Sequence, residues 1–116
     1  MFLNELDLKQ KETFICLAHV VAVSDGELSP EERLMMNELK REIDLSPEFE
    51  PHYMSTDGIR EVFNTRSARV ATIIALTRLG YADGAFEIEE QFLLKEICVT
   101  FEVTESDFTI IENWVR

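Results

Sequence analysis

An acidic sequence motif occurs twice in this 116-residue chain. Residues 25–32 read Asp-Gly-Glu-Leu-Ser-Pro-Glu-Glu and residues 83–90 read Asp-Gly-Ala-Phe-Glu-Ile-Glu-Glu, so a shift of 58 residues aligns the copies without a gap. Most of the identical positions are carboxylates, and apolar residues match apolar residues in the segments that follow. We interpret the chain as a tandem duplication with internal repeats at approximately 8–58 and 66–116.

Two long apolar segments precede the two motifs. Residues 14–23 and 70–82 are apolar nearly all round, which is typical of helices enclosed by other helices. Each runs into Asp-Gly, so we expect Gly26 and Gly84 to end these helices with a positive φ. These two helices should form the centre of the fold.

The Ser-Pro-Glu-Glu sequence at 29–32 is a strong helix start, with Ser at the N-cap, Pro at N1 and Glu at N3 in a capping box. Apolar residues then recur every three or four positions. We expect the remaining helices at about 30–43, about 88–101, from Thr104 to the end, and as short segments from Ser46 and near 57–64. No segment alternates strictly as a strand would. We therefore predict an all-α single domain over residues 1–116, a bundle of about seven helices.

The charge of the chain is strongly acidic. It has 23 acidic and 11 basic residues and a net charge of -12, which disfavours nucleic acid as a partner and favours cations or basic partners. Four arginines gather between residues 55 and 80, where they could pair with the acidic surface or bind an acidic partner: Arg60, Arg66, Arg69 and Arg78. The sequence predicts neither a signal peptide nor a membrane span, so we expect a cytoplasmic protein without membrane insertion.

The cysteines and histidines give little support to an enzyme. Cys16 and Cys98 lie in apolar helical segments and are not equivalent under the shift, which favours buried free thiols in a reducing compartment. His19 lies within the first apolar helix and is expected to be a core residue, whereas His52 lies in the linker. With no nucleophile beside a base and no phosphate loop, we predict no catalytic residues and no enzymatic activity.

The repeated carboxylates are the main functional lead. Asp25 and Asp83 each follow a long helix, where the helix dipole disfavours an anion by about 0.3–1 kcal/mol. Their compensation could come from N–H donors of the turn, or from a cation shared with Glu32 or Glu90. The capping box accounts for Glu32, but Glu90 is less well explained because Glu87, at the equivalent N-cap position, caps poorly.

The motif matches the second half of an EF-hand loop but not the first. Ligand positions one and three would be Val21 and Val23, or Leu79 and Tyr81, and none of these side chains can bind calcium as an EF-hand loop requires. Oxygen ligands without neighbouring Cys or His still favour a hard divalent cation such as calcium or magnesium. We expect such binding to be weak.

The chain resembles the TerB-like family of helical domains associated with tellurite resistance. The resemblance rests on the paired signatures Ala-Val-Ser-Asp-Gly before Glu-Glu and Tyr-Ala-Asp-Gly before Glu-Glu, and it covers nearly the whole chain. It implies about seven helices in two pseudo-twofold related halves. It also implies that acidic residues are metal ligands, here Asp25, Glu32, Asp83 and Glu90. Domains of the family that it resembles occur in stress-response operons and fused to J-type co-chaperones.

Two functional hypotheses follow. The first is a non-enzymatic cytoplasmic module that binds a divalent cation weakly and acts, with a protein partner, in tellurite resistance or stress response. The alternative is a structural protein-interaction domain of the adaptor or co-chaperone type, whose carboxylates serve only as helix caps.

Overall fold

The computed structural model describes residues 5–24, 26, 28–81 and 88–115, and within these ranges it contains six α-helices and no strand. The helices are α1 (Leu8–Ala22), α2 (Pro30–Glu42), α3 (Ile59–Val62), α4 (Arg66–Gly80), α5 (Ile88–Thr100) and α6 (Glu105–Val115). The prediction of an all-α fold is confirmed. The described residues have six helices where we expected about seven.

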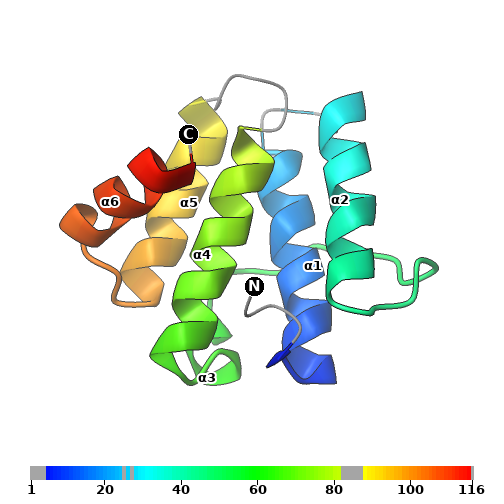
Figure 1. Ribbon diagram of the computed structural model, residues 1–116, viewed down its shortest axis with the longest axis horizontal. Coiled ribbons are helices and arrows are strands. Elements are labelled where there is room, and N and C mark those ends of the chain that lie inside the picture. Colours follow the sequence, from blue (N-terminus) through cyan, green and yellow to red (C-terminus); the bar gives the residue numbers. More distant parts are fainter. Residues whose placement is uncertain (1–4, 25, 27, 82–87, 116) are drawn as a thin grey trace.

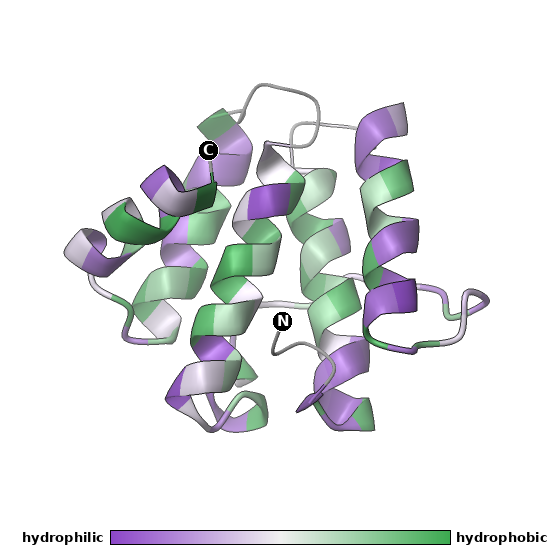
Figure 2. Ribbon diagram, in the orientation of Figure 1, coloured by the Kyte–Doolittle hydropathy of each residue, from purple (hydrophilic) through white to green (hydrophobic). Residues whose placement is uncertain are grey.

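Helices α1 and α4 lie side by side in the middle of the bundle and run in the same direction (Figure 1). α2 packs beside α1, α5 packs beside α4, and α6 lies against α4 and α5. Apolar residues follow the length of both central helices (Figure 2). Phe14 and Leu17 of α1, and Ile73 and Leu76 of α4, are at most 1% exposed. The two apolar segments therefore form the centre of the fold, as the sequence predicts.

The helix bounds of the two halves correspond under the 58-residue shift. α1 and α4 both have 15 residues, α2 and α5 both have 13, and each pair begins and ends at equivalent positions. The ends of α2 and α5 also use the same hydrogen bonds: Leu45 N–H donates to Lys40 O at 2.9 Å, and Val103 N–H donates to Cys98 O at 2.8 Å. These correspondences support the interpretation as a duplication.

The turns that end α2 and α5 contain residues in the left-handed region. Asp44 has a φ of 57° and Glu102, its equivalent, has a φ of 61°. Gly26 has the expected positive φ, at 119°, but α1 already ends at Ala22, so Gly26 lies in the turn that follows and does not itself end the helix. Gly84 lies outside the described residues. The left-handed residue lets the chain reverse and satisfy the last carbonyls of the helix.

The short helix expected from Ser46 is not formed. Residues 47–48 are a turn, in which Phe49 N–H donates to Ser46 O at 3.1 Å. Lys40 holds this segment, because its Nζ donates to Phe49 O at 3.0 Å. The prediction was wrong because it gave too little weight to Pro51, which lacks an N–H donor and disfavours helical geometry in the residue before it.

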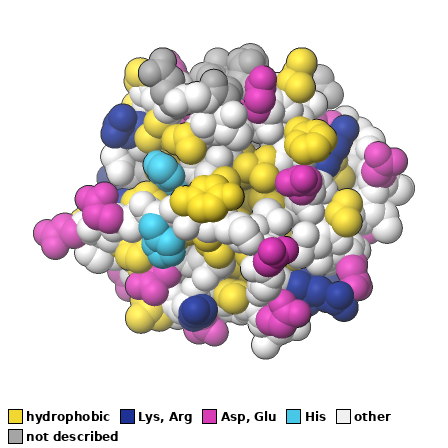
Figure 3. Space-filling model, turned by 180° about the vertical axis from the view of Figure 1, so that it is seen from behind, with side chains coloured by type: hydrophobic (Ala, Val, Ile, Leu, Met, Phe, Trp, Pro, Cys, Tyr) yellow, Lys and Arg dark blue, Asp and Glu magenta, His cyan; other side chains and the backbone are white. Residues whose placement is uncertain are grey.

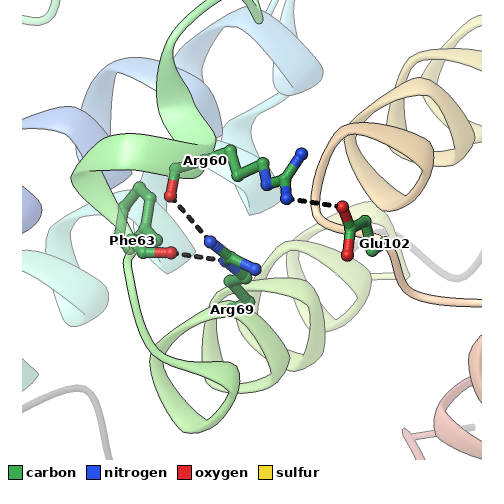
Figure 4. Close-up of polar contacts among 4 residues, drawn as sticks. All are labelled: Arg60, Phe63, Arg69 and Glu102. Atoms are coloured by element: carbon green, nitrogen blue, oxygen red, sulfur yellow. Dashed lines mark hydrogen bonds and ion pairs between the residues drawn. The ribbon is translucent and has the colours of Figure 1, made fainter.

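Polar contacts attach the short helix α3 to the second half of the chain (Figure 4). The Arg69 guanidinium donates to the carbonyl oxygens of Phe63 and Arg60, so it caps the end of α3. Arg60 forms an ion pair of 2.7 Å with Glu102, in the turn before α6. The rings of Phe63 and Phe101 also meet edge to face, with centroids 5.6 Å apart. The linker is thereby fixed to the bundle.

Replacing Asp44 with Gly should stabilise the protein by about 0.5–1 kcal/mol, because glycine adopts a positive φ without steric cost. Asp44 is exposed, so few other contacts change. The measurement is the free energy of unfolding from urea titration. Glu38→Gly, at an exposed position inside α2, is the matched control and should destabilise by about 1 kcal/mol. A loss of stability in Asp44→Gly would show that the left-handed turn is not strained.

Candidate cation site at one end of the bundle

The described parts of both acidic motifs lie at the same end of the bundle. α1 and α4 end there, and α2 and α5 begin there (Figure 1). The first turns of α2 and α5 carry the paired glutamates of the two motifs. Because the halves have matching helices, Glu32 and Glu90 occupy equivalent positions: each is the third residue of its helix. The fold therefore brings the paired glutamates of the two motifs to one end.

Glu32 closes the predicted capping box. Its Oε1 accepts the Ser29 N–H at 3.0 Å, and its own N–H donates to Ser29 Oγ at 3.1 Å. The residue is only 2% exposed. A carboxylate has about four lone-pair sites on two oxygens, so one capping bond does not exhaust what it can bind. The capping role and a ligand role are chemically compatible.

Glu90 is buried to the same degree, at 1% exposure. The first glutamate of each pair, Glu31 and Glu89, is exposed instead. In both motifs one carboxylate thus faces solvent and the next is enclosed by the bundle. Burying an ionised carboxylate is costly unless hydrogen bonds or a cation compensate for the lost water. The helix N-terminus supplies part of that compensation.

Asp25 and Asp83 lie outside the described residues, so the full set of four carboxylates is not placed. Residues next to Asp25 in the first motif are described. The Gly26 N–H donates to Val23 O at 2.9 Å, and the Ser24 hydroxyl donates to Val21 O at 2.8 Å. Among the described residues, no group of three or more His, Cys, Asp or Glu side chains is arranged to hold a metal. The four-residue site stays a prediction.

The four arginines between residues 55 and 80 bind partners within the protein. Three pair with carboxylates and one donates to backbone carbonyls: Arg60 with Glu102 at 2.7 Å, Arg66 with Asp107 at 3.1 Å, Arg78 with Glu42 at 3.9 Å, and Arg69 with the end of α3. These contacts support their interpretation as ion-pair partners of the acidic surface. They give less support to the alternative that the arginines form a binding surface for an acidic partner.

The cysteines are free and buried, as predicted, but the histidines differ from expectation. His19 is not a core residue: it is half-buried, on a side of α1 that its neighbouring helices leave open. His52 is exposed, and its Nδ1 lies 3.6 Å from Cys16 Sγ. Sequence analysis missed this contact because it joins positions 36 residues apart. Only the tertiary fold places the linker over α1.

Burial raises the pKa of the Cys98 thiol from 9.0 to about 12. The native state therefore keeps this thiol protonated at a pH where the unfolded chain ionises it. Proton binding is then greater in the native state between pH 9 and about 12, so stability falls as the pH rises through that window.

Replacing Cys98 with Val, which is of similar size and does not ionise, should remove this contribution. The difference in free energy of unfolding between variant and wild type should be constant below pH 9 and should move in favour of the variant above it. Urea unfolding at several pH values from 7 to about 11 measures the difference. A constant difference over the whole series would mean that Cys98 ionises as readily in the native protein as in the unfolded chain.

Within the described part of the chain, no helix is long and apolar enough to cross a membrane. No curated protein and no solved structure matches the chain significantly. The profile of the family described as tellurite resistance protein TerB matches residues 51–113, which is more than half of the chain. The matched range includes α3, α4, α5, most of α6 and the sequence of the second acidic motif. The chain belongs to the TerB family.

Proposed function

We propose that this TerB-family domain is a non-enzymatic module that binds a divalent cation weakly and acts in tellurite resistance or stress response. The cation is calcium or magnesium, and its ligands are Asp25, Glu32, Asp83 and Glu90. The observation that carries the proposal is the burial of Glu32 and Glu90, which occupy equivalent positions at the same end of the bundle.

The electrostatics of this end favour a bound cation. The C-terminal ends of α1 and α4 contribute partial negative charge, and the paired glutamates add full charges. The N-termini of α2 and α5 offset only part of this charge. A hard cation would neutralise the remainder through oxygen ligands, which the repeated motif supplies in excess. Exposed Glu31 and Glu89 would raise the local cation concentration without being buried ligands.

The alternative is a protein-interaction domain whose acidic residues serve only as helix caps. The capping box between Ser29 and Glu32 supports it, because these hydrogen bonds explain the position of Glu32 without a cation. The two proposals differ in what happens to stability when the carboxylates of the second motif are neutralised.

The double variant Asp83→Asn/Glu90→Gln separates these proposals. If the residues bind a cation, millimolar calcium should raise the melting temperature of the wild type, and this gain should disappear in the variant. A hundredfold excess of calcium over its Kd would add about 2.7 kcal/mol of stability. Without calcium the variant should be as stable as the wild type or more so, since repulsion between carboxylates is relieved.

The control variant is Glu89→Gln, which removes a charge from the same turn at an exposed position. It should keep most of the calcium-dependent gain. Each melt is compared with one in EDTA and with one in sodium chloride of equal ionic strength. A double variant that loses stability equally with and without calcium would support the capping role, and a wild type unaffected by calcium would contradict the cation proposal.

A further inference from the structure

The thiol of Cys16 lies against an exposed imidazole. Cys16 belongs to α1 and is 1% exposed, whereas His52 is exposed and belongs to the segment between α2 and α3. Their contact brings the ring against the sulfur from the solvent side. Figure 3 shows two histidine side chains on one face of the molecule, among hydrophobic side chains, and these are the two histidines of the chain, His19 and His52.

The sulfur does not lie along the lone pair of either ring nitrogen of His52. Cys16 Sγ is 3.6 Å from Nδ1 and 3.9 Å from Nε2. The two nitrogens point away from different sides of the ring, so a hydrogen bond aligned with one of them would leave the other much farther from the sulfur. The imidazole lone pair is therefore available to a ligand that enters beside the thiol.

The separation between the sulfur and the ring nitrogens matches what a bridging metal ion requires. Bonds of about 2.3 Å to sulfur and about 2.0 Å to nitrogen, as zinc forms, hold the two atoms about 3.5 Å apart at a tetrahedral angle and about 4.3 Å apart when the ligands are opposite each other. The observed 3.6 Å and 3.9 Å fall within this range. A turn of the exposed His52 ring would direct a nitrogen at the metal while the backbone stays in place.

The number of ligands at this position selects the class of metal. His19 lies one turn further along α1, but among the described residues no group of three His, Cys, Asp or Glu side chains is arranged to hold a metal ion. The ligands in place are one sulfur and one nitrogen. Structural zinc is almost always four-coordinate, and calcium takes about six to eight oxygens. Cu(I) is a soft ion that accepts few ligands and is selected by thiolate sulfur.

Charge balance also favours a monovalent ion. Metal binding replaces the thiol proton, which leaves for solvent, so that Cys16 becomes a thiolate. Cu(I) and a thiolate together are neutral, and burying a neutral pair costs much less than burying a charge. A divalent ion would leave a positive charge beside a side chain that is only 1% exposed.

We propose that Cys16 and His52 form a Cu(I) site, with the Cys16 thiolate and one imidazole nitrogen of His52 as ligands. His19 is the side chain placed to add a third ligand after a change of rotamer, because residues three apart on a helix share a face. The site differs from the acidic end of the bundle in donor chemistry, sulfur and nitrogen instead of oxygen. The inference therefore does not depend on calcium or magnesium binding.

Competition for Cu(I) tests the site. Cu(I) is added under nitrogen to the intact, reduced protein together with bicinchoninate, a chelator whose Cu(I) complex is coloured. The protein should remove a single equivalent of Cu(I) from the chelator, and the absorbance measures how much is removed. Proton NMR adds a local readout, because Cu(I) is diamagnetic. The ring signals of His52 should shift when Cu(I) binds, and calcium should not shift them.

His52→Ala is the test variant, because its side chain is exposed and its removal leaves the core intact. Loss of an outer-shell partner already weakens metal binding by about 10–100-fold, so loss of a direct ligand should weaken Cu(I) binding by at least about tenfold. Cys16→Ser should abolish the binding. Because Cys16 is buried, urea unfolding must show that this second variant is folded.

Cys98→Val is the matched control. It removes the other buried thiol, which lines a depression with Lys95, Val99 and Phe108, and no histidine is among the residues that line it. This variant should bind Cu(I) as tightly as the wild type does.

Three outcomes would overturn the inference. A wild-type protein that removes no Cu(I) from the chelator has no such site. Equal affinity of His52→Ala and wild type would mean that a thiol binds Cu(I) without the imidazole. Loss of binding in Cys98→Val would place the metal at the other thiol. The last two outcomes decide the matter even if Cys16→Ser does not fold.

Discussion

The packing of α1 against α4 is the contact on which the remaining structure depends. Both helices are apolar nearly all round, so each needs neighbours on several sides. They run in the same direction, which puts both of their C-terminal ends at one end of the bundle (Figure 1). α2 and α5 must then start at that end and return along the outside. The position of the paired glutamates in the first turns of α2 and α5 is a consequence of this arrangement.

At this end of the molecule, the capping box that starts α2 lies where the fold buries its glutamate. The capping box of Ser29 and Glu32 starts α2, and burial of Glu32 follows because the start of α2 lies against the end of α1. Glu90 is equally buried at the start of α5. A carboxylate in the first turn of a helix is often exposed to solvent, whereas in both halves this one is buried and needs hydrogen bonds or a cation to replace the lost water.

The sequence was sufficient to predict the helices whose apolar spacing is regular. The segments that became α1, α2, α4, α5 and α6 were all expected, as was the capping box. Prediction failed where a local start signal competed with proline: Ser46 begins a turn and not a helix. It also failed for His19, because an apolar helix with helical neighbours can still leave one side open. The contact between Cys16 and His52 depends on tertiary packing alone.

The direct measurement of the central claim is a calcium titration of the isotopically labelled protein followed by amide NMR. Cation binding by the repeated motif predicts saturable shifts that concentrate in residues 25–34 and 83–92, in both motifs and at one end of the bundle. Sodium chloride of equal ionic strength should not reproduce them. Small unsaturated shifts spread over exposed carboxylates elsewhere, such as Glu12 and Glu105, would contradict the claim and leave the glutamates as helix caps.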